Sequence, residues 1–376
     1  MMQKIAVLGC GMVGSTIAKD LSKKFSVTGF DQNLMHLNAL KESNPELEVR
    51  SADLKNTSAY SEWLQPFDLV VIAVPGFMGF ETLKAVIEAG KDVVDISFFP
   101  EDALLLDSLA KEKNVTAVVD CGVAPGMSNL IAGYYDDQMQ INEFSCYVGG
   151  LPVERKKPFE YKAPFSPIDV IEEYIRPARI KENGQIVVKP ALSEIELLDF
   201  EGIGTLEAFN TDGLRTLLFT LPGIPNLKEK TIRYPGHAKW MEGLKRAGFF
   251  SDRPVMVNGM KMRCIEATSA ILFKEWKLEP GMQEFTIMKV NIEGEGKRIE
   301  YTLLDRFDPS TRTSSMSRTT GYTCAAAANL VLEGKFNEKG IFPPEFIGKR
   351  NGCFNYILDY LKERNVNWQK KEEQNI

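Results

Sequence analysis

Short apolar runs alternate with amphipathic, helix-length stretches from residue 4 to about residue 120. Runs rich in β-branched residues predict strands at Lys4–Leu8, Ser26–Phe30, Leu69–Val74, Val93–Ile96 and Thr116–Val119, with a weaker one at Glu48–Ser51. Helices are predicted between them at Ser15–Lys24, Leu34–Lys41, Phe80–Ala89 and Asp102–Lys113, with Gly90 and Asn114 at C-terminal caps. Such alternation is typical of a doubly wound parallel sheet with crossover helices.

The pattern changes after about residue 124, where glycine and proline become more frequent and strands no longer alternate with helices. Glu284–Val290 and Ile299–Leu304 predict a hairpin around Gly294 and Gly296. This part is therefore expected to be an α+β domain with some antiparallel sheet.

The C-terminal part is predicted to hold one Ala-rich helix, Thr323–Leu332, which ends at Gly334. Its small side chains would let it approach a sheet closely, so we expect it to return and pack on the first domain. The tail after Trp368 is polar and is predicted to be frayed.

Length and composition fit a globular enzyme of about two domains. The chain has 376 residues, of which 44% are hydrophobic and 26% charged, and its net charge is −6. No basic run predicts a nucleic-acid surface. The N-terminus shows no leader pattern, and no apolar run approaches the roughly 20 residues that span a bilayer, so a cytoplasmic protein is expected.

The thiols and histidines do not predict a metal site. No pair of cysteines has C-x-x-C spacing, and the two histidines are far apart in sequence. Reduced thiols are expected at the scattered cysteines, Cys10, Cys121, Cys146, Cys264, Cys324 and Cys353.

A glycine fingerprint predicts a dinucleotide site. Gly9-Cys10-Gly11-Met12-Val13-Gly14 follows an apolar strand and opens a helix, and Asp31 closes the next strand. The glycines allow a tight turn, close approach to the pyrophosphate and close helix packing, while the helix N-terminus attracts the phosphates. Asp31, followed by Gln32 rather than an arginine, favours NAD over NADP because a carboxylate repels a 2′-phosphate.

Two further segments are expected to contact the coenzyme. Asp53-Leu54 is placed to flank the adenine, and Ala73-Val74-Pro75 to border the nicotinamide ribose. The alternative is a glycine-rich turn that binds another nucleotide or none.

Carboxylates that follow strands are candidates for the chemistry, because ligands bind at the carboxyl ends of such strands. Asp95-Ile96-Ser97 and Asp120-Cys121-Gly122 both occupy this position. Each aspartate is a site residue or a turn or cap residue, and the sequence favours a functional role more for Asp120.

Each candidate site residue in the second domain also has a structural interpretation. His237 is catalytic, substrate-binding or a structural turn residue, whereas His36 is predicted to be a solvated surface residue. Arg215 would clamp a carboxylate or pair with Asp212. Tyr147 would place a hydroxyl in a cleft or pack in the core. Trp240 and the methionines are predicted to be core residues.

The chain resembles the saccharopine dehydrogenase-like superfamily, and within it the lysine 6-dehydrogenase branch. The resemblance covers nearly the whole chain. It is found in AVPGFMGF (73–80), VVDISFFPED (93–102), DCGVAPGMSN (120–129), YVGGLP (147–152), LEAFNTDGLRTL (206–217), TIRYPGH (231–237) and SSMSRTTGYT (314–323).

The resemblance implies a Rossmann domain at 1–123 completed by 320–376, a substrate-binding and oligomerisation domain at 124–319, and a homodimer or larger homo-oligomer. The implied reaction is NAD-dependent oxidation of the ε-amino carbon of L-lysine, which gives allysine, its cyclised form and ammonia. Saccharopine or carboxynorspermidine formation, or a catalytically silent NAD-binding regulator, are alternatives.

The implied activity assigns hypothetical roles to the candidate residues. Asp120 would hold the substrate ammonium near the nicotinamide beside Gly122, and His237 or Asp120 would take its proton. Arg215 or Arg233 would pair with the α-carboxylate, and Tyr147 would hydrogen-bond the substrate. Only Arg215, Arg233 and Lys162 are candidate cations, which mildly favours a substrate with few carboxylates.

Overall fold

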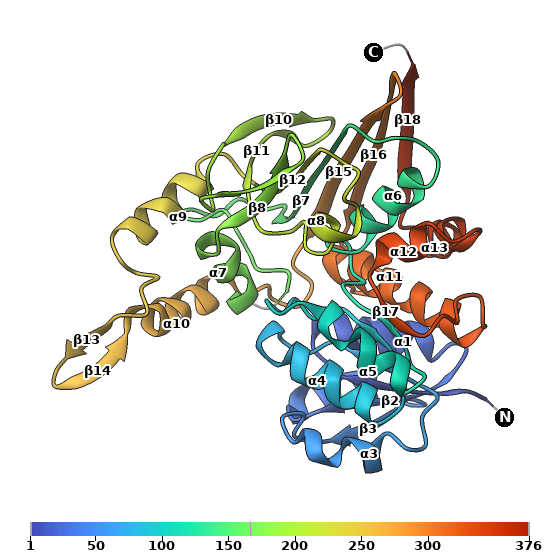
Figure 1. Cartoon of the computed structure of the whole chain (residues 1–376). Helices are drawn as coiled ribbons and strands as arrows, with labels where there is room; N and C mark the ends of the chain where they lie inside the picture. The colour runs from blue at the N-terminus through green and yellow to red at the C-terminus, as the bar shows by residue number, and fades with distance from the viewer. Residues whose placement is uncertain (1, 166, 375–376) are drawn as a thin grey trace. The chain divides into compact units, whose positions relative to one another are not determined.

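The structure, a computed structural model, describes residues 2–165 and 167–374 (Figure 1). It divides into two compact units, the first Met1–Met139 with Ser317–Asn367 and the second Gln140–Met316 with Trp368–Ile376. Within the described residues, no helix is both long and apolar enough to cross a membrane.

The first unit is built on a seven-stranded parallel sheet of order β17-β6-β5-β4-β1-β2-β3. Its strands are β1 (Lys4–Leu8), β2 (Ser26–Asp31), β3 (Glu48–Ser51), β4 (Leu69–Ile72), β5 (Asp92–Asp95), β6 (Thr116–Val118) and β17 (Gly340–Phe342). Six of them follow the order of a dinucleotide-binding Rossmann sheet, to which β17 adds an edge. The predicted doubly wound parallel sheet is confirmed.

Helices connect these strands and complete the unit. They are α1 (Met12–Leu21), α2 (Leu34–Ser43), η1 (Thr57–Ala59), α3 (Tyr60–Trp63), α4 (Gly76–Glu88), η2 (Ala103–Leu106), α5 (Asp107–Glu112), α6 (Met127–Asp136), α11 (Ser315–Leu332, whose first residues belong to the second unit), α12 (Pro344–Gly348) and α13 (Cys353–Lys362). The predicted helix Asp102–Lys113 is in fact η2 followed by α5, because the Asp102 side chain accepts from Leu104 N–H and starts a tighter first turn.

The C-terminal segment packs on the first unit through small residues. A Cβ added at Gly321 of α11 would lie 3.3 Å from Ile17 of α1. The helices α6 and α12 cross still more closely, because a Cβ at Gly133 would lie 2.0 Å from the carbonyl oxygen of Glu345. Figure 1 shows α12 and α13 beside α6. The sequence predicted the return of α11 but not the strand β17.

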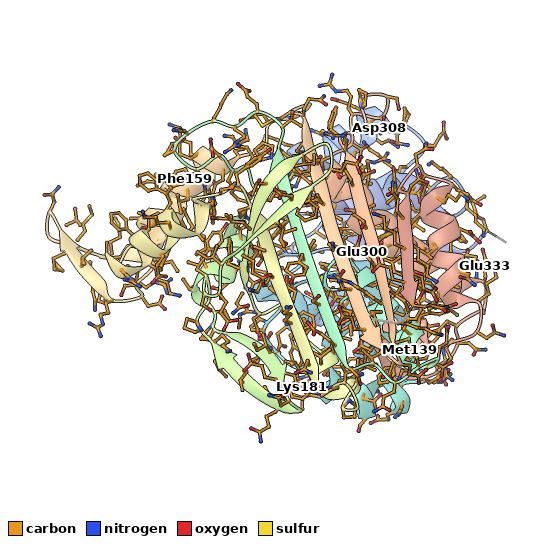
Figure 2. The ribbon with its side chains drawn as sticks, turned by 90° about the horizontal axis from the view of Figure 1, so that it is seen from above. Met139, Phe159, Lys181, Glu300, Asp308 and Glu333 are labelled. Atoms are coloured by element: carbon orange, nitrogen blue, oxygen red, sulfur yellow. The ribbon has the colours of Figure 1, made fainter. Side chains whose placement is uncertain are left out.

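The second unit contains a nine-stranded mixed sheet, with the path β10-β11-β12-β7-β15-β16-β18 and β8 and β9 attached to β12. Only β12 and β7 pair in parallel. The strands are β7 (Glu143–Pro152), β8 (Ala178–Glu182), β9 (Gln185–Lys189), β10 (Glu196–Phe200), β11 (Gly204–Asn210), β12 (Asn226–Arg233), β15 (Glu284–Gly294), β16 (Lys297–Arg306) and β18 (Trp368–Gln374). Figure 2 looks onto one face of this sheet, on which Glu300 lies.

The remaining elements of the second unit are four helices and a separate hairpin. They are α7 (Pro167–Ile175), α8 (Leu217–Thr220), α9 (His237–Arg246), α10 (Cys264–Trp276), β13 (Pro254–Val257) and β14 (Met260–Arg263). The predicted hairpin around Gly294 and Gly296 is confirmed as β15 and β16. Its two-residue turn, Glu295-Gly296, has φ of 50° and 70°, as a type I′ turn requires.

Two predictions about the second unit are wrong. The tail after Trp368 is the strand β18, which pairs with the open edge of β16 and places its charged residues opposite one another, as in Glu300 and Lys371. Trp240 is 56% exposed rather than buried, and Met256 and Met260 are exposed as well. A hydrophobic residue type does not by itself show that a side chain is buried, because surface helices and hairpins also expose hydrophobic residues.

Asp20 joins the C-terminal helix to α1. Its buried carboxylate accepts from the Tyr360 hydroxyl and the Arg364 guanidinium, each at 2.7 Å. Asp20→Ala should lower the free energy of unfolding by about 3 kcal/mol, because it leaves the guanidinium half of a buried pair unpaired. Urea denaturation would measure this. Lys23→Ala removes an exposed partner of the same carboxylate and should change stability by less than about 0.5 kcal/mol; equal losses would contradict the assignment.

Candidate coenzyme and substrate sites

The glycine loop between β1 and α1 has the shape of a pyrophosphate cradle. Gly9 has φ of 96°, and a Cβ there would lie 2.3 Å from the carbonyl oxygen of Ala73. A Cβ at Gly14 would lie 1.9 Å from the Gly9 oxygen, whereas one at Gly11 would meet nothing within 4 Å. Gly9 and Gly14 therefore hold the loop closed, and Gly11 faces the open space that a diphosphate would need.

The N-terminus of α1 provides the donors for such a ligand. The helix begins at Met12 with Gly11 as its cap, and no side chain caps it. The first-turn amides of Met12, Val13 and Gly14 have no intrahelical acceptor and carry the positive end of the helix dipole. The residues present therefore fit a dinucleotide phosphate.

Asp31, at the end of β2, is fixed beside this loop. Its carboxylate accepts from the amides of Cys10 and Asn33, each at 2.8 Å, and His36 Nδ1 lies 3.2 Å away. His36 was predicted to be only solvated; it is 45% exposed at its side chain, but it also contacts Asp31. Gln32 is exposed. The carboxylate has about four acceptor sites, so ribose hydroxyls would share it with the two amides and would compete with His36 for the remaining sites.

The other predicted coenzyme residues lie at neighbouring strand ends. The order of strands reverses between β1 and β4, so the crevice of such a sheet lies where Gly9 meets Ala73. Val74 is buried and Pro75 precedes α4 as its cap. After β3, Asp53 is exposed and makes a turn with Lys55 N–H, whereas Leu54 is buried in the core.

Asp95 and Ser97 form a buried polar pair where β5 ends. Asp95 Oδ1 accepts from Ser97 N–H at 2.7 Å, and both residues are buried. The Ser97 hydroxyl has no hydrogen-bond partner among the described residues. Buried hydroxyls are normally satisfied, so this one is suited to bond a ligand or an ordered water.

Asp120 follows β6 in a left-handed conformation, with φ of 52°, and is buried. The next residues form a tight turn in which Gly122 N–H donates to Pro125 O. Gly126, at φ of 140°, has no room for a side chain because its Cβ would overlap the Gly122 oxygen. This turn leads into α6 and fixes where the Asp120 backbone lies.

Two buried thiols near the predicted site, Cys121 and Cys10, are not suited to act as nucleophiles. Burial, followed by the negative charges of Asp120 and Asp95, raises the pKa of Cys121 to about 12. Burial, followed by Asp31, raises the pKa of Cys10 to about 12. Both stay protonated near neutral pH, so they offer no thiolate for covalent chemistry.

In the second unit, His237 lies inside an aromatic cluster. The rings of Tyr161 and Tyr174 lie 5.3 and 5.6 Å from the imidazole, and Trp276 packs edge-on against both tyrosines. The helix that it begins is held by Glu207, whose carboxylate accepts from Gly236 and Ala238 N–H. Burial and then the charge of Arg233 lower the pKa of His237 to about 3.

The hydrogen bonds of His237 determine its tautomer. Nδ1 lies 3.0 Å from the Phe159 carbonyl, which can only accept, so Nδ1 carries the proton. Nε2 therefore accepts from the Tyr174 hydroxyl at 3.0 Å, and the Tyr174 oxygen accepts from Arg233 Nε. Both ring nitrogens have hydrogen-bond partners and burial favours the neutral ring, so among the predicted alternatives these contacts favour a structural turn role for His237.

Arg233 is also committed within the unit. Its guanidinium donates to Glu173 at 2.7 Å, to the hydroxyls of Tyr161 and Tyr174, and to the Ile232 carbonyl. It is 2% exposed. Releasing it to bind a substrate carboxylate would leave the partly buried Glu173 unpaired, so these contacts favour a structural role for Arg233, whose substrate role stays a prediction.

Tyr147 lies on the opposite face of the sheet from Arg233. Tyr147 pairs in register with Lys230, and Arg233 is three residues further along β12, so their side chains point to opposite faces. The Tyr147 hydroxyl lies 3.4 Å from Glu196, and Lys230 pairs with the same carboxylate. The sequence had grouped these residues in one site.

The loop that carries Arg215 is held by two carboxylates. Arg179 donates to both oxygens of Asp212, and the alternative that Arg215 pairs with Asp212 stays a prediction. Glu229 accepts from the Thr211 hydroxyl at 2.7 Å and from Gly213 N–H at 3.1 Å. Arg215 itself is buried with φ of 53°.

Glu229 is a functional candidate that the sequence reasoning missed. Burial raises its pKa to about 8, so it is largely protonated at neutral pH. A carboxyl with such a pKa, next to a constrained arginine loop, is typical of binding or catalytic sites. A signal in the sequence could have found it. Alternation along the strand places Glu229 on the same face as Leu227, Thr231 and Arg233, where an acidic residue is unexpected.

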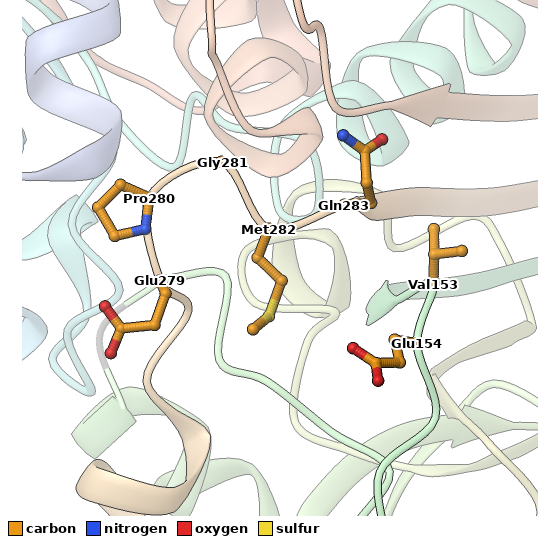
Figure 3. A pocket seen from close by; sticks show the side chains of 7 residues that line it. All are labelled: Val153, Glu154, Glu279, Pro280, Gly281, Met282 and Gln283. Atoms are coloured by element: carbon orange, nitrogen blue, oxygen red, sulfur yellow. The ribbon is translucent and has the colours of Figure 1, made fainter.

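A shallow hollow of ≈ 490 Å³ lies elsewhere in the second unit (Figure 3). It contains none of the predicted site residues, and its lining is Val153, Glu154, Glu279, Pro280, Gly281, Met282 and Gln283. Glu154 and Glu279 already pair with lysines at 3.0 and 3.1 Å, so they would attract a cation weakly.

Comparison with protein-family models decides the family. The saccharopine dehydrogenase NADP binding domain matches residues 5–118, and the saccharopine dehydrogenase C-terminal domain matches residues 122–366. The chain belongs to the saccharopine dehydrogenase family. The predicted resemblance is thereby confirmed, and the family is one of oxidoreductases.

Individual relatives are distant. The chain is 24% identical over 66% of its length to bovine alpha-aminoadipic semialdehyde synthase, of which it spans 28%. It is 23% identical to the saccharopine dehydrogenase [NADP(+), L-glutamate-forming] of Schizosaccharomyces pombe (91% of this chain, 94% of the relative). It is 20% identical to the carboxyaminopropylagmatine dehydrogenase of Synechocystis (92% of each).

Among solved structures, the fold matches that of apo saccharopine dehydrogenase (L-Glu forming) from Saccharomyces cerevisiae. The TM-score is 0.80, with 19% identity over 99% of this chain and 100% of that chain.

Two glycine substitutions separate the fold of the loop from its binding function. Gly14→Ala should destabilise the first unit by about 2 kcal/mol or more, because its methyl group would collide with the Gly9 oxygen. Gly11→Ala should cost less than about 1 kcal/mol but weaken coenzyme binding about tenfold or more, because its methyl group enters the open cradle. Thermal unfolding and calorimetry would measure both. Unchanged coenzyme affinity in Gly11→Ala would show that the phosphates bind elsewhere.

The neutral state of His237 predicts a stability that depends on pH. Its pKa is lower in the folded than in the unfolded protein, so the unfolded state binds the extra proton and stability is lost as pH falls from about 6.5 toward about 3. Between about pH 7 and about pH 4.5, the unfolding free energy of the wild type should fall by roughly 2 to 3 kcal/mol more than that of His237→Asn. Urea denaturation at both pH values tests this; identical losses would show that His237 is accessible to protons.

Proposed function

We propose that this protein is an NAD-dependent dehydrogenase that oxidises the ε-amino carbon of L-lysine to give allysine, which cyclises, and ammonia. The observation that carries the proposal is the commitment of Arg233 to Glu173 and the tyrosines. Lys162 likewise donates to the Glu275 carbonyl. Of the three cations expected to bind substrate carboxylates, we assign the α-carboxylate to Arg215, which stands on the loop that Glu229 supports. One such cation suits a substrate with one carboxylate.

The preference for NAD rests on Asp31. The carboxylate is held at the glycine loop by two amides, where the adenosine ribose is bound in Rossmann domains. A 2′-phosphate at that position would bring like charges together in a partly buried place. The matching family model is described as NADP binding, so the residue at this position, rather than membership of the family, supports NAD.

The residues assist a reaction in which the ε-carbon loses a hydride and its nitrogen loses a proton. The bound dinucleotide supplies the hydride acceptor. Asp120, buried at the carboxyl end of β6, is suited to hold the ε-ammonium through its carboxylate. Water then adds to the imine carbon, and ammonia leaves as the aldehyde forms. His237 takes no part, because its ring nitrogens are occupied and neutral.

Glu229 is proposed to position Arg215 for the α-carboxylate. One of its two carboxyl oxygens, Oε2, accepts hydrogen bonds from the Thr211 hydroxyl and from Gly213 N–H. A Cβ at Gly213 would lie 2.4 Å from this carboxyl group. Because the group is largely protonated near neutral pH, it supports the loop without competing strongly for the guanidinium charge.

A second candidate is the reductive joining of an amine to a keto acid or aldehyde. Relatives that match more than nine-tenths of both chains are named for saccharopine and for carboxyaminopropylagmatine. Reductive joining forms a secondary amine, whereas lysine oxidation releases the nitrogen of a primary amine as ammonia. Lysine oxidation and reductive joining differ in the number of carboxylates and cations that their substrates carry.

A spectrophotometric substrate screen tests the proposal. Lysine should give NADH, with ornithine, diaminopimelate and saccharopine much slower. Arg215→Met should raise the KM for lysine about tenfold or more while coenzyme affinity stays unchanged, since it removes a charge-assisted bond. NADPH consumption with an amine plus a keto acid, and no NADH from lysine, would overturn the proposal in favour of the second candidate.

A further inference from the structure

A hairpin arm of the second unit forms a two-stranded sheet that is separate from the large sheet. The arm is defined as residues 252–263, which contain β13 and β14. Within the described residues, these two strands pair only with each other. Isolated two-stranded hairpins are at best marginally stable in water, so a surface outside the arm is needed to stabilise it. Figure 2 shows the arm, in pale yellow, extending away from the large sheet of this unit.

One face of the arm is wholly apolar. The register pairs Val255 with Met262 and Val257 with Met260, so these four side chains share a face. Val255, Val257 and Met260 are 42%, 44% and 63% exposed. On the other face, Met256 is 67% exposed beside the basic side chains. A cluster of exposed hydrophobic residues of this kind marks an interaction site.

Hydrogen bonds and ion pairs connect the base of the arm to the residues that flank it. Ile265 N–H donates to the Ser251 carbonyl, and the Thr268 hydroxyl donates to the Phe249 carbonyl. Arg263 pairs with Asp252 and Glu266. At the tip, Asn258-Gly259 forms a two-residue turn with φ of 51° and 80°. The arm is therefore a defined hairpin rather than a loop that collapses onto the unit.

A second unpaired surface of the same unit has the opposite charge. The acidic edge, residues 194–201, contains β10, which ends the path of the large sheet. It exposes Ile195 and Leu197, at 51% and 65%. Glu194 and Glu196 pair with Lys189 and Lys230, so the negative charge of this edge comes from Asp199 and Glu201. The arm carries Arg253, Lys261 and Arg263, and its one acidic residue, Asp252, pairs with Arg263.

We propose that the arm binds the acidic edge of a second copy of this chain, with a strand of the arm adding to β10. Both surfaces present unpaired strand edges of similar length and exposed hydrophobic residues, and their charges are complementary. Contact between two arms, or between two acidic edges, would bring like charges together. A two-fold axis makes each copy donate one arm and accept one, so neither arm is left free.

Charge reversal tests the contact in the full-length protein. Arg253→Glu with Lys261→Glu should raise the dimer dissociation constant about tenfold or more, since both side chains are exposed and would face acidic ones. Combining this pair with Asp199→Lys and Glu201→Lys should restore the dimer to within about threefold. Lys239→Glu with Lys274→Glu, exposed lysines outside the arm, is the matched control and should leave the dimer intact.

Sedimentation velocity would measure these constants, and cross-linking identifies the partner surface. In a Cys264→Ser background, which removes the half-buried thiol beside the arm, chains with Leu197→Cys and chains with Met260→Cys should form mixed disulfides on mild oxidation. A monomeric wild type, a dimer that the reversals leave unchanged, or disulfides only between Met260→Cys chains would each overturn the proposal. None of these results depends on the substrate of the enzyme.

Discussion

The first unit depends on the contact between the backbones of Gly9 and Gly14. With hydrogen in place of a side chain at position 14, α1 can start directly above the end of β1, close to Ala73 at the end of β4. This approach directs the unpaired amides of α1 toward the crevice where the strand order reverses. The same contact leaves Gly11 facing open space. Close packing and ligand binding therefore impose different requirements on glycines only a few positions apart.

The first unit was predicted well because the spacing of its hydrophobic residues and the positions of its turn residues indicate the same strands and helices. Apolar runs such as Leu69–Ile72 are buried on both faces, which an all-parallel sheet requires, and the glycine fingerprint lies in register with them. The edge strand β17 was missed because three residues carry too little periodicity. The tail that forms β18 was read as frayed because its charges suggested solvent, although an edge strand tolerates them.

The second unit shows why residue type alone could not identify its site. Histidine, arginine and tyrosine are common in active sites, and the sequence analysis grouped His237, Arg233 and Tyr147 in one site. The register of β12 separates Tyr147 from Arg233, and the pairing of Arg233 with Glu173 uses the charge internally. Glu229, by contrast, looked like an ordinary strand residue. Its raised pKa arises from burial among residues distant in sequence, which no local pattern reports.

These contrasts bear on where the chemistry lies. A buried histidine with a carbonyl on one nitrogen and a hydroxyl on the other is satisfied, so nothing remains for a substrate to displace. Asp120 is different, because it occupies a left-handed conformation just beyond a strand end, between a buried strand and a glycine turn without room for side chains. Such a conformation costs free energy in a residue other than glycine, and the surrounding turn must impose it. Backbone strain at the ligand-binding edge of a Rossmann sheet therefore favours Asp120, rather than the histidine, as the side chain that we propose to hold the substrate amine.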